Sequence, residues 1–225
     1  MWVTLSAAMD WALLRDLPET DKRRVLSAAR LKRFSRNEVI YHEGDPGDTL
    51  HLISKGRVAI RVTTPLGSVA TLAVLGAGDF FGEQALLGSD ARRTATVTAL
   101  EKTETMALLR DDFETLQTDH PAVLRFLVII LAAQVRRLSG QVLDALYTSA
   151  DDRVLRQLVH LADIYGGRKT GTAIPLTQDD LATMAGTSRA TVNRVLSEAE
   201  QAGILAVGRM KIEILDPDKL AQRAR

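Results

Sequence analysis

Residues 176–196 have the sequence LTQDDLATMAGTSRATVNRVL, and this spacing predicts two short helices joined by a tight turn. Thr177 can cap the first helix, because a hydroxyl oxygen accepts a hydrogen bond from the free N–H groups of a first turn. Gly186 can end that helix with a positive φ, and Thr187 or Ser188 can cap the second. The segment therefore predicts a helix-turn-helix.

The second helix of this pair has an outward face that suits DNA. Val192, Val195 and Leu196 form its inward face, which leaves short, polar and cationic side chains on the other side. Such a helix N-terminus fits the major groove, where arginine binds guanine O6 and N7. The residues expected to contact DNA from the helix pair are Thr177, Gln178, Ser188, Arg189, Ala190, Thr191, Asn193 and Arg194. The alternative interpretation is a pair of packed surface helices without a ligand.

Residues 204–215 predict a β-hairpin directly after the second helix. Gly208 and Arg209 stand at the expected turn. Apolar residues then alternate along the second strand at Met210, Ile212 and Ile214. A hairpin in this place is the wing of a winged helix, and it would bring Arg209 and Lys211 to DNA phosphates.

The composition fits a soluble globular protein with two small domains. The chain has 225 residues, 25% of them charged, and a net charge of +1, so DNA binding depends on local clusters of cations. It has no cysteine, which excludes disulfides, thiolate zinc sites and cysteine-ligated iron–sulfur clusters. The longest uninterrupted apolar run, residues 126–133, is too short to cross a bilayer, and the first residues lack a cationic signal-peptide region. We expect a cytoplasmic protein with no membrane partner.

The segment from residue 31 to 109 predicts a barrel or jelly roll. Its β-rich runs are residues 38–41, 50–53, 58–62, 69–74, 94–99 and 104–109, and glycine- or proline-containing turns separate most of them. Many short strands at such spacing are typical of closed all-β folds. The preceding residues 5–29 are expected to be helical, with a break before Pro18.

After Asp112 the pattern is expected to be helical again as far as about Tyr147, with a long helix from about residue 121. Within it, apolar residues recur at alternating steps of four and three, at Leu124, Val128, Leu131, Val135, Leu138, Val142 and Ala145. This heptad pattern is typical of a parallel two-stranded coiled coil. The alternative is a single helix packed on its own barrel; we favour the homodimer, because the helix is apolar on more than one face. Residues 148–152 are expected to form a hinge before the last domain.

Residues 80–97 differ from the ordinary strand pattern of the barrel. Gly82 to Leu87 can form one short helix, whose first N–H groups would point at an anion. The guanidinium of Arg93 can bind a phosphate through two parallel hydrogen bonds, and Glu83 can accept from a sugar hydroxyl. These groups favour a cyclic nucleotide as ligand; the alternative is a helical turn with an incidental surface ion pair.

The sequence FGEQAL at residues 81–86, followed by RTA at 93–95, resembles the phosphate-binding cassette of cyclic-nucleotide-binding barrels. The order of barrel, long helix and winged helix resembles the Crp/Fnr family of bacterial regulators, from about Leu13 to Leu215. The resemblance implies that Gly82 and Glu83 meet phosphate and ribose and that Arg93 meets the phosphate. The ligand contacts that it implies are Gly82, Glu83, Gln84, Ala85, Arg93, Thr94, Leu138 and Ser139.

The chain departs from this family at two places. Members that bind cyclic AMP use a Thr-Ser pair on the long helix to reach adenine, and here the pair is Leu138-Ser139, in which Leu138 offers no hydrogen bond. Thr94 is similar to the residue in some cyclic-GMP cassettes, so cyclic GMP stays open beside cyclic AMP, the first choice. On the recognition helix Ala190 replaces a Glu between matching arginines, which removes a cytosine contact and implies a shifted half-site.

The resemblance implies an α+β protein with three parts: a sensor domain at residues 1–120, a dimerisation helix at 121–148 and a winged helix-turn-helix at 149–225. Its implied partners are double-stranded DNA with palindromic half-sites, a second copy of the chain and RNA polymerase. No tightly bound cofactor or metal is expected. The remaining alternatives are a regulator that binds DNA without any cyclic nucleotide, or one that responds to another ligand.

An enzyme is the rival from a different class. The sequence contains no nucleophile elbow, P-loop, HExxH motif or paired-carboxylate motif. A haem sensor is not expected either, because the histidines lie outside the long helix, at His42, His51, His120 and His160. We therefore expect no catalytic residues.

Overall fold

The computed structural model describes residues 18–64, 67, 69–86, 92–167 and 169–224. The chain divides into two compact units, and along its longest helix the boundary lies between Leu138 and Ser139. The expected N-terminal helix is confirmed from Glu19 onward, as α1 (Glu19–Ala28). The part of this expectation before Pro18 lies outside the described residues.

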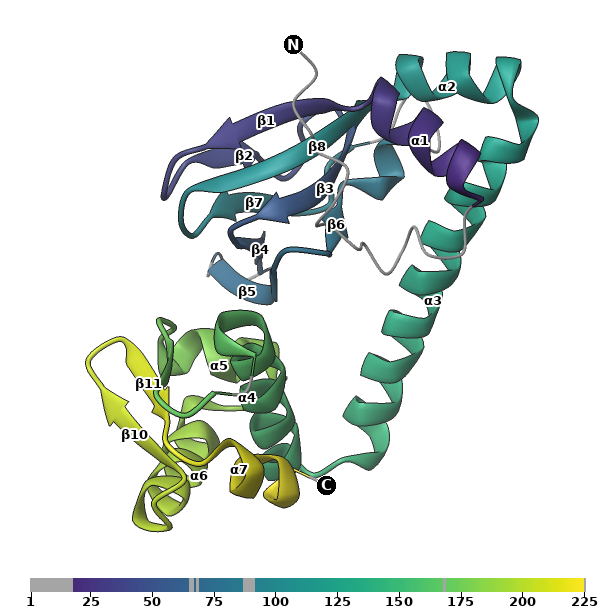
Figure 1. The fold of residues 1–225 in the computed structure, drawn as a ribbon. Coiled ribbons are helices and arrows are strands. Elements are labelled where there is room, and N and C mark those ends of the chain that lie inside the picture. The colour runs from purple at the N-terminus through teal and green to yellow at the C-terminus, as the bar shows by residue number, and fades with distance from the viewer. Residues whose placement is uncertain (1–17, 65–66, 68, 87–91, 168, 225) are drawn as a thin grey trace. The chain divides into compact units, whose positions relative to one another are not determined.

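The strands between residues 30 and 109 form two four-stranded sheets, as expected for a jelly roll (Figure 1). One sheet has the order β1-β8-β3-β6 and the other the order β2-β7-β4-β5. The strands are β1 (Arg30–Phe34), β2 (Val39–Tyr41), β3 (Thr49–Lys55), β4 (Val58–Thr63), β5 (Val69–Leu75), β6 (Phe80–Phe81), β7 (Thr96–Ala99) and β8 (Thr103–Leu109).

Two of these strands, β1 and β6, are not predicted by the sequence pattern. β1 reads RLKRF, so cations mask its alternation, and it is held by pairing with β8, where Arg33 Nε donates to Glu104 Oε1 at 3.0 Å. β6 has only two residues and pairs with β3, with His51 opposite Phe81. A strand this short has no measurable period, yet it leads directly into the cassette.

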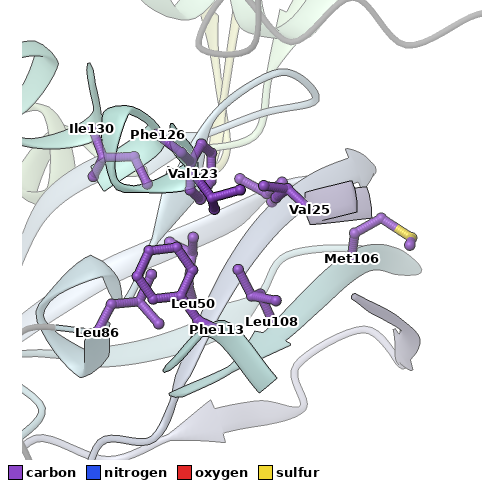
Figure 2. Close-up of a cluster of buried hydrophobic side chains, with 10 residues drawn as sticks. Val25, Leu50, Leu86, Met106, Leu108, Phe113, Val123, Phe126 and Ile130 are labelled. Carbon is purple, nitrogen blue, oxygen red and sulfur yellow. The ribbon is translucent and has the colours of Figure 1, made fainter. Parts of the chain in front are cut away.

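The main core of the first unit lies between β3, β8 and the helices that follow the barrel (Figure 2). These are α2 (Arg110–Asp119), the 3₁₀ turn η3 (Pro121–Val123) and α3 (Leu124–Tyr147). The core side chains are Val25, Leu50, Leu52, Leu86, Met106, Leu108, Phe113, Val123, Phe126 and Ile130. Phe126 and Ile130 are fully buried, so one face of α3 packs on its own barrel.

The opposite face of α3 carries the heptad positions and stays exposed. Val128 is 59% exposed, Val135 62%, Leu138 49% and Val142 56%. By length and composition alone, α3 is a helix that could cross a membrane, although no run within it is uninterrupted for that length. Its buried side in the barrel core accounts for part of this apolar character, and the exposed stripe accounts for the rest.

The C-terminal elements form a winged helix with a three-stranded sheet of order β10-β11-β9. They are α4 (Ala150–Gly166), β9 (Thr172–Ile174), α5 (Gln178–Met184), α6 (Arg189–Gln201), β10 (Leu205–Gly208), β11 (Lys211–Ile214) and α7 (Pro217–Arg223). The expected hinge of residues 148–152 is too long. Ser149 caps α4 by accepting from the backbone N–H of Asp152 at 3.1 Å, so the last residues of that hinge are already helical.

The wing is confirmed, but its turn is shifted by one residue from the expectation. Gly208 pairs with Lys211, which leaves Arg209 and Met210 as the loop. Met210 has φ +52° and is 66% exposed, so it is not an inward residue of β11. Ile212 and Ile214 are buried as expected.

Candidate functional site

The cassette begins where β6 ends at Gly82. This residue has φ +78°, and a Cβ there would lie 2.7 Å from Arg93 Nη1 and 2.8 Å from the carbonyl oxygen of Thr49. Only glycine therefore fits beneath the arginine. The expected helix from Gly82 to Leu87 is a 3₁₀ turn, η2 (Glu83–Leu86), and Leu87 lies outside the described residues.

Arg93 is the central charge of the cassette and is only 7% exposed. Its Nη1 donates to the carbonyl oxygen of Thr49 at 2.9 Å and lies 3.5 Å from that of Gly82. Its Nη2 lies 3.7 Å from Oδ1 of Asp48, a mostly exposed side chain. Burial lowers the pKa of Arg93, but arginine starts so high that the side chain stays cationic at neutral pH.

One edge of this guanidinium carries a donor without an acceptor among the described residues. Nε of Arg93 is buried, and no atom among the described residues accepts its proton. Nε and Nη2 lie on the same edge of the planar group, and this edge binds carboxylates and phosphates through two parallel hydrogen bonds. A buried donor without an acceptor is costly, so the geometry fits an anion at this edge.

The other predicted ligand residues lie around this arginine to different degrees. Glu83 is half-buried and lies close enough to Tyr41 to influence the pKa of its hydroxyl, whereas Gln84 and Thr94 are exposed. Ala85 is buried, and its N–H donates to the Gly82 carbonyl at 3.1 Å, so the turn itself uses this amide. Further along the chain, Leu138 and Ser139 lie on the exposed side of α3.

Aromatic residues beneath the cassette are not anticipated by the motif. The guanidinium carbon of Arg93 lies 4.1 Å from the ring centroid of Tyr41. The ring of His51 stacks on Phe81 at 4.8 Å, and its Nδ1 lies 3.0 Å from Thr105 Oγ1. Burial, reinforced by Arg93, lowers the pKa of His51 to about 3, so His51 is neutral. The alternation of Tyr41 within its predicted strand is the only sequence signal for this cluster.

The helix-turn-helix is confirmed together with its caps. Thr177 accepts from the backbone N–H of Asp180 at 3.0 Å, and the Asp180 carboxylate accepts from the N–H of Thr177, which completes a capping box. Gly186 has φ +59° in the turn. Ser188 then caps α6 by accepting from the N–H of Thr191 at 3.1 Å. Gln178 is the first residue of α5.

The arginines of α6 are exposed and already hold carboxylates. Arg189 Nη1 lies 3.2 Å from Asp179 Oδ2. Arg194 bridges Asp151 Oδ1 at 2.5 Å and Glu198 Oε1 at 3.1 Å, and these hydrogen bonds raise its pKa. Ala190 and Asn193 are exposed on the same helix, whereas Val192, Val195 and Leu196 are buried as predicted.

The wing presents its cations separately from α6. Arg209 is exposed in the loop, and Lys211 is exposed at the start of β11. Lys211 Nζ lies 2.6 Å from Glu213 Oε2 on the same face of the strand. All four predicted cations are therefore accessible, and in three of them the charge is paired with a carboxylate.

Comparisons with known proteins agree with both halves of this arrangement. Residues 31–120 match the model of the cyclic nucleotide-binding domain, and residues 152–223 match that of the Crp-like helix-turn-helix domain. The chain is 31% identical to a CRP-like cAMP-activated global transcriptional regulator of Mycobacterium tuberculosis, over 85% of this chain and 87% of the relative. It is 33% identical to the cyclic AMP receptor protein of Thermus thermophilus, over 88% and 90%.

Solved structures show the same relationship. The crystal structure of the Thermus thermophilus catabolite activator protein is 31% identical, covers 94% of this chain and 97% of its own, and has a TM-score of 0.53. A CRP-family regulator from the same organism is 28% identical over 86% of this chain and 96% of its own, with a TM-score of 0.70. The chain combines a cyclic-nucleotide-binding barrel with a DNA-binding winged helix. It belongs to the Crp/Fnr family of transcriptional regulators.

Proposed function

We propose that this regulator acts as a homodimer whose binding to palindromic DNA is controlled by a cyclic nucleotide, with cyclic AMP as the first choice. The observation that carries the proposal is the buried Nε of Arg93, which has no acceptor among the described residues and shares an edge with Nη2. A buried cation is stable only when it is well paired. A cyclic phosphate would supply an acceptor for Nε and would take the place of the exposed Asp48 carboxylate beside Nη2.

The remaining cassette residues would complete the nucleotide site. Glu83 would accept from the ribose hydroxyl, and the exposed Thr94 hydroxyl would add a contact to the phosphate. Gly82, Gln84 and Ala85 would form the turn beside the phosphate, and the amide of the buried Ala85 is used within that turn. Ser139 would offer one polar group to the base, whereas Leu138 would offer none. Thr94 keeps cyclic GMP as the second candidate, and the names of the relatives favour cyclic AMP.

The exposed face of α3 supports the homodimer. Its heptad positions form a continuous apolar stripe on the face opposite Phe126 and Ile130. Large exposed apolar stripes are typical of interaction surfaces, and a heptad repeat pairs with a copy of itself. We infer a sensor domain at residues 1–120, a dimerisation helix at 121–148 and a DNA-binding domain at 149–225.

At the DNA end the proposed roles are divided between helix and wing. Arg189 and Arg194 would read base edges, with Ala190 and Asn193 lying beside them on α6. Arg209 and Lys211 would contact phosphates. Further contacts from the helix starts are assigned to Thr177, Gln178, Ser188 and Thr191. In a dimer the two recognition helices would enter successive major grooves, about one DNA turn apart.

The same proposal covers partners, location and chemistry. A regulator that binds promoter DNA works beside RNA polymerase, and in a bacterial cell both are in the cytoplasm. The members of this family are regulators, and we infer that this chain has no enzymatic activity.

Calorimetry with cyclic AMP and cyclic GMP tests the ligand directly. We expect one of them to bind with one site per chain and to change the affinity for a labelled palindromic DNA in a salt-dependent gel shift. Arg93→Lys is the matched variant, since it keeps the charge but loses the two-donor edge, and it should bind nucleotide more weakly. Binding of neither nucleotide by the wild type would instead leave a DNA-binding regulator that responds to no cyclic nucleotide.

A further inference from the structure

Tyr41 lies at the end of β2 and pairs with Val97 of β7, the strand that follows Arg93. It is partly buried, and its ring faces the guanidinium of Arg93 at 4.1 Å. We propose that Tyr41 is a positioning residue, which holds Arg93 so that its Nε–Nη2 edge faces the phosphate. This inference rests on the proposed nucleotide site and adds to it a residue that lies outside the cassette motif.

The contacts of Arg93 leave one orientation for the group. Nη1 is fixed at one corner by the carbonyl oxygen of Thr49, at 2.9 Å. Nη2 lies 3.7 Å from the exposed Asp48 carboxylate, a looser contact, so the plane can still tilt about the Nη1 corner. The ring of Tyr41 covers one face of the plane and prevents this tilt, so the edge with Nε stays available. The two contacts together fix a corner and a face, which define the plane of the guanidinium.

The attraction between the two groups comes from the ring rather than from a charge on the hydroxyl. Burial raises the pKa of Tyr41 well above its ordinary value, so the side chain stays a neutral phenol. A neutral aromatic face attracts a guanidinium through its quadrupole, and this attraction is stronger where water is excluded. Arg93 is only 7% exposed, so this cation–π contact is largely shielded from water. Phenylalanine should therefore replace Tyr41 with little loss.

The ring of Tyr41 is itself supported from behind. Its centroid lies 5.9 Å from that of Phe81 and 6.4 Å from that of His51. Because His51 stacks on Phe81 and is neutral, the cluster presents aromatic surface to Arg93 and no second cation. Phe34 packs against the far part of the same cluster, with its ring edge-on to His51 at 6.0 Å. Phe34 thus offers a control for simple loss of aromatic packing.

The test is the nucleotide affinity of Tyr41→Leu, Tyr41→Phe and Phe34→Leu in the full-length chain, measured by calorimetry with cyclic AMP. We expect Tyr41→Leu to bind roughly tenfold more weakly, which corresponds to about 1.4 kcal/mol and lies between the values of an exposed and a desolvated cation–π contact. Tyr41→Phe should restore binding to near the wild-type value. Phe34→Leu should lower thermal stability and leave the affinity unchanged. Equal losses in Tyr41→Leu and Phe34→Leu would overturn the positioning role.

A double-mutant cycle with Arg93→Lys separates positioning from packing. Lysine has no planar group to orient, so Tyr41→Leu should cost much less in the Arg93→Lys background than in the wild type. The same tenfold cost in both backgrounds would mean that Tyr41 acts through the fold of the barrel rather than through the guanidinium.

A second measurement does not depend on the nucleotide. In ¹⁵N-labelled protein, the Nε–H resonance of Arg93, identified by its loss in Arg93→Lys, should be shifted upfield by the ring above it. The shift should be lost in Tyr41→Leu and kept in Tyr41→Phe. If the wild type binds neither nucleotide, the proposed function fails while this spectrum still decides the placement of Arg93. An unchanged resonance in Tyr41→Leu would overturn the inference itself.

Discussion

The two ends of this chain hold their arginines in opposite ways. At the cassette, Arg93 is 7% exposed and is held by backbone carbonyls and an aromatic ring. On the recognition helix, the Arg189 and Arg194 side chains are 62% and 53% exposed and are held only by carboxylates that are themselves open to water. Arg93 is fixed by backbone and ring atoms of the fold, whereas Arg189 and Arg194 are paired with exposed carboxylates.

This difference fits the two kinds of ligand. A small anion offers few contacts, so each must be oriented before binding, in a site where low dielectric strengthens the interaction. DNA offers many phosphates and base edges, and its binding gains from counterion release and from side chains that can adapt. The buried arginine therefore suits affinity for one ligand, whereas the exposed arginines suit a choice among sequences.

The largest effect is expected from separating the two copies of the chain. Val128→Lys together with Val135→Lys places charges in the exposed stripe of α3, opposite its buried face. We expect monomers in sedimentation and a loss of DNA affinity of about 10²–10⁴-fold, because two linked half-site contacts become independent. Arg125→Lys, on the same helix, is the control that adds no charge. A dimer that survives would assign this stripe to another partner.

Removing the buried cation should break the ligand end and leave the DNA end intact. Arg93→Ala deletes the group that offers the two-donor edge, so nucleotide binding should weaken by about 2–5 kcal/mol. The nucleotide-free protein should bind DNA as the wild type does, since α6 is unchanged. Calorimetry and gel shifts on the same preparation measure both. Loss of DNA binding without nucleotide would show that the two ends are not separable in this way.

The buried His51 in the aromatic cluster beneath the cassette should also make the sensor domain sensitive to acid. His51 has a folded-state pKa of about 3, below the value near 6.5 of an unfolded histidine, so the unfolded chain takes up a proton first as pH falls. The stability that neutral His51 contributes is complete above pH 6.5 and is lost progressively toward pH 3. Between pH 6.5 and 5 the loss is about 2 kcal/mol.

Urea unfolding of the wild type and His51→Gln at pH 7 and pH 5 checks this pH dependence. The variant should be less stable at pH 7 but should lose less stability between the two values. His42→Gln, which changes an exposed histidine, should follow the wild type. Parallel curves for His51→Gln and the wild type would assign the acid sensitivity to other groups.

The parts that sequence predicts well are those set by local rules. The caps at Thr177 and Ser188, the positive φ of Gly186 and the inward face of α6 all depend on residues a few positions apart. They are confirmed by the structure. The contact between Gly82 and Arg93 is likewise implied by a motif of fixed spacing, and the structure brings these two residues together.

The parts that sequence misses depend on packing between distant segments. Tyr41 meets Arg93 because β2 pairs with β7, and the backbone of Arg93, just before β7, exchanges hydrogen bonds with Gly44 and Asp45, just after β2. No local period encodes that meeting. The wing turn is predicted one residue too early because glycine is a common turn residue. In the structure Gly208 pairs with Lys211, and Met210 takes the positive φ. The hinge is shorter than expected because Ser149 starts α4 early.

At the DNA end, a smaller and sequence-dependent effect should separate α6 from the wing. Arg189→Ala should cost about 1–3 kcal/mol and relax the choice of one base pair, since it removes a base-edge contact. Lys211→Ala should weaken binding to all sequences and reduce the slope of log affinity against log salt by about 1. A library of binding sites, measured at two salt concentrations, distinguishes them. Identical profiles for the two variants would contradict the division of roles.

The smallest effect tests whether DNA displaces the carboxylates that are paired with the exposed arginines. Asp151 accepts from Arg194 at 2.5 Å, and DNA must displace it before the arginine can reach a base. Asp151→Asn should therefore raise DNA affinity by roughly two- to fivefold, the size expected of an exposed ion pair, and the gain should fade as salt increases. Asp152→Asn is the matched control. It removes the same charge at the next residue, and the Asp152 carboxylate accepts from Ser149 rather than from Arg194. An equal gain in both variants would reflect general charge alone, and no gain in Asp151→Asn would mean that Arg194 does not need to leave this partner to bind DNA.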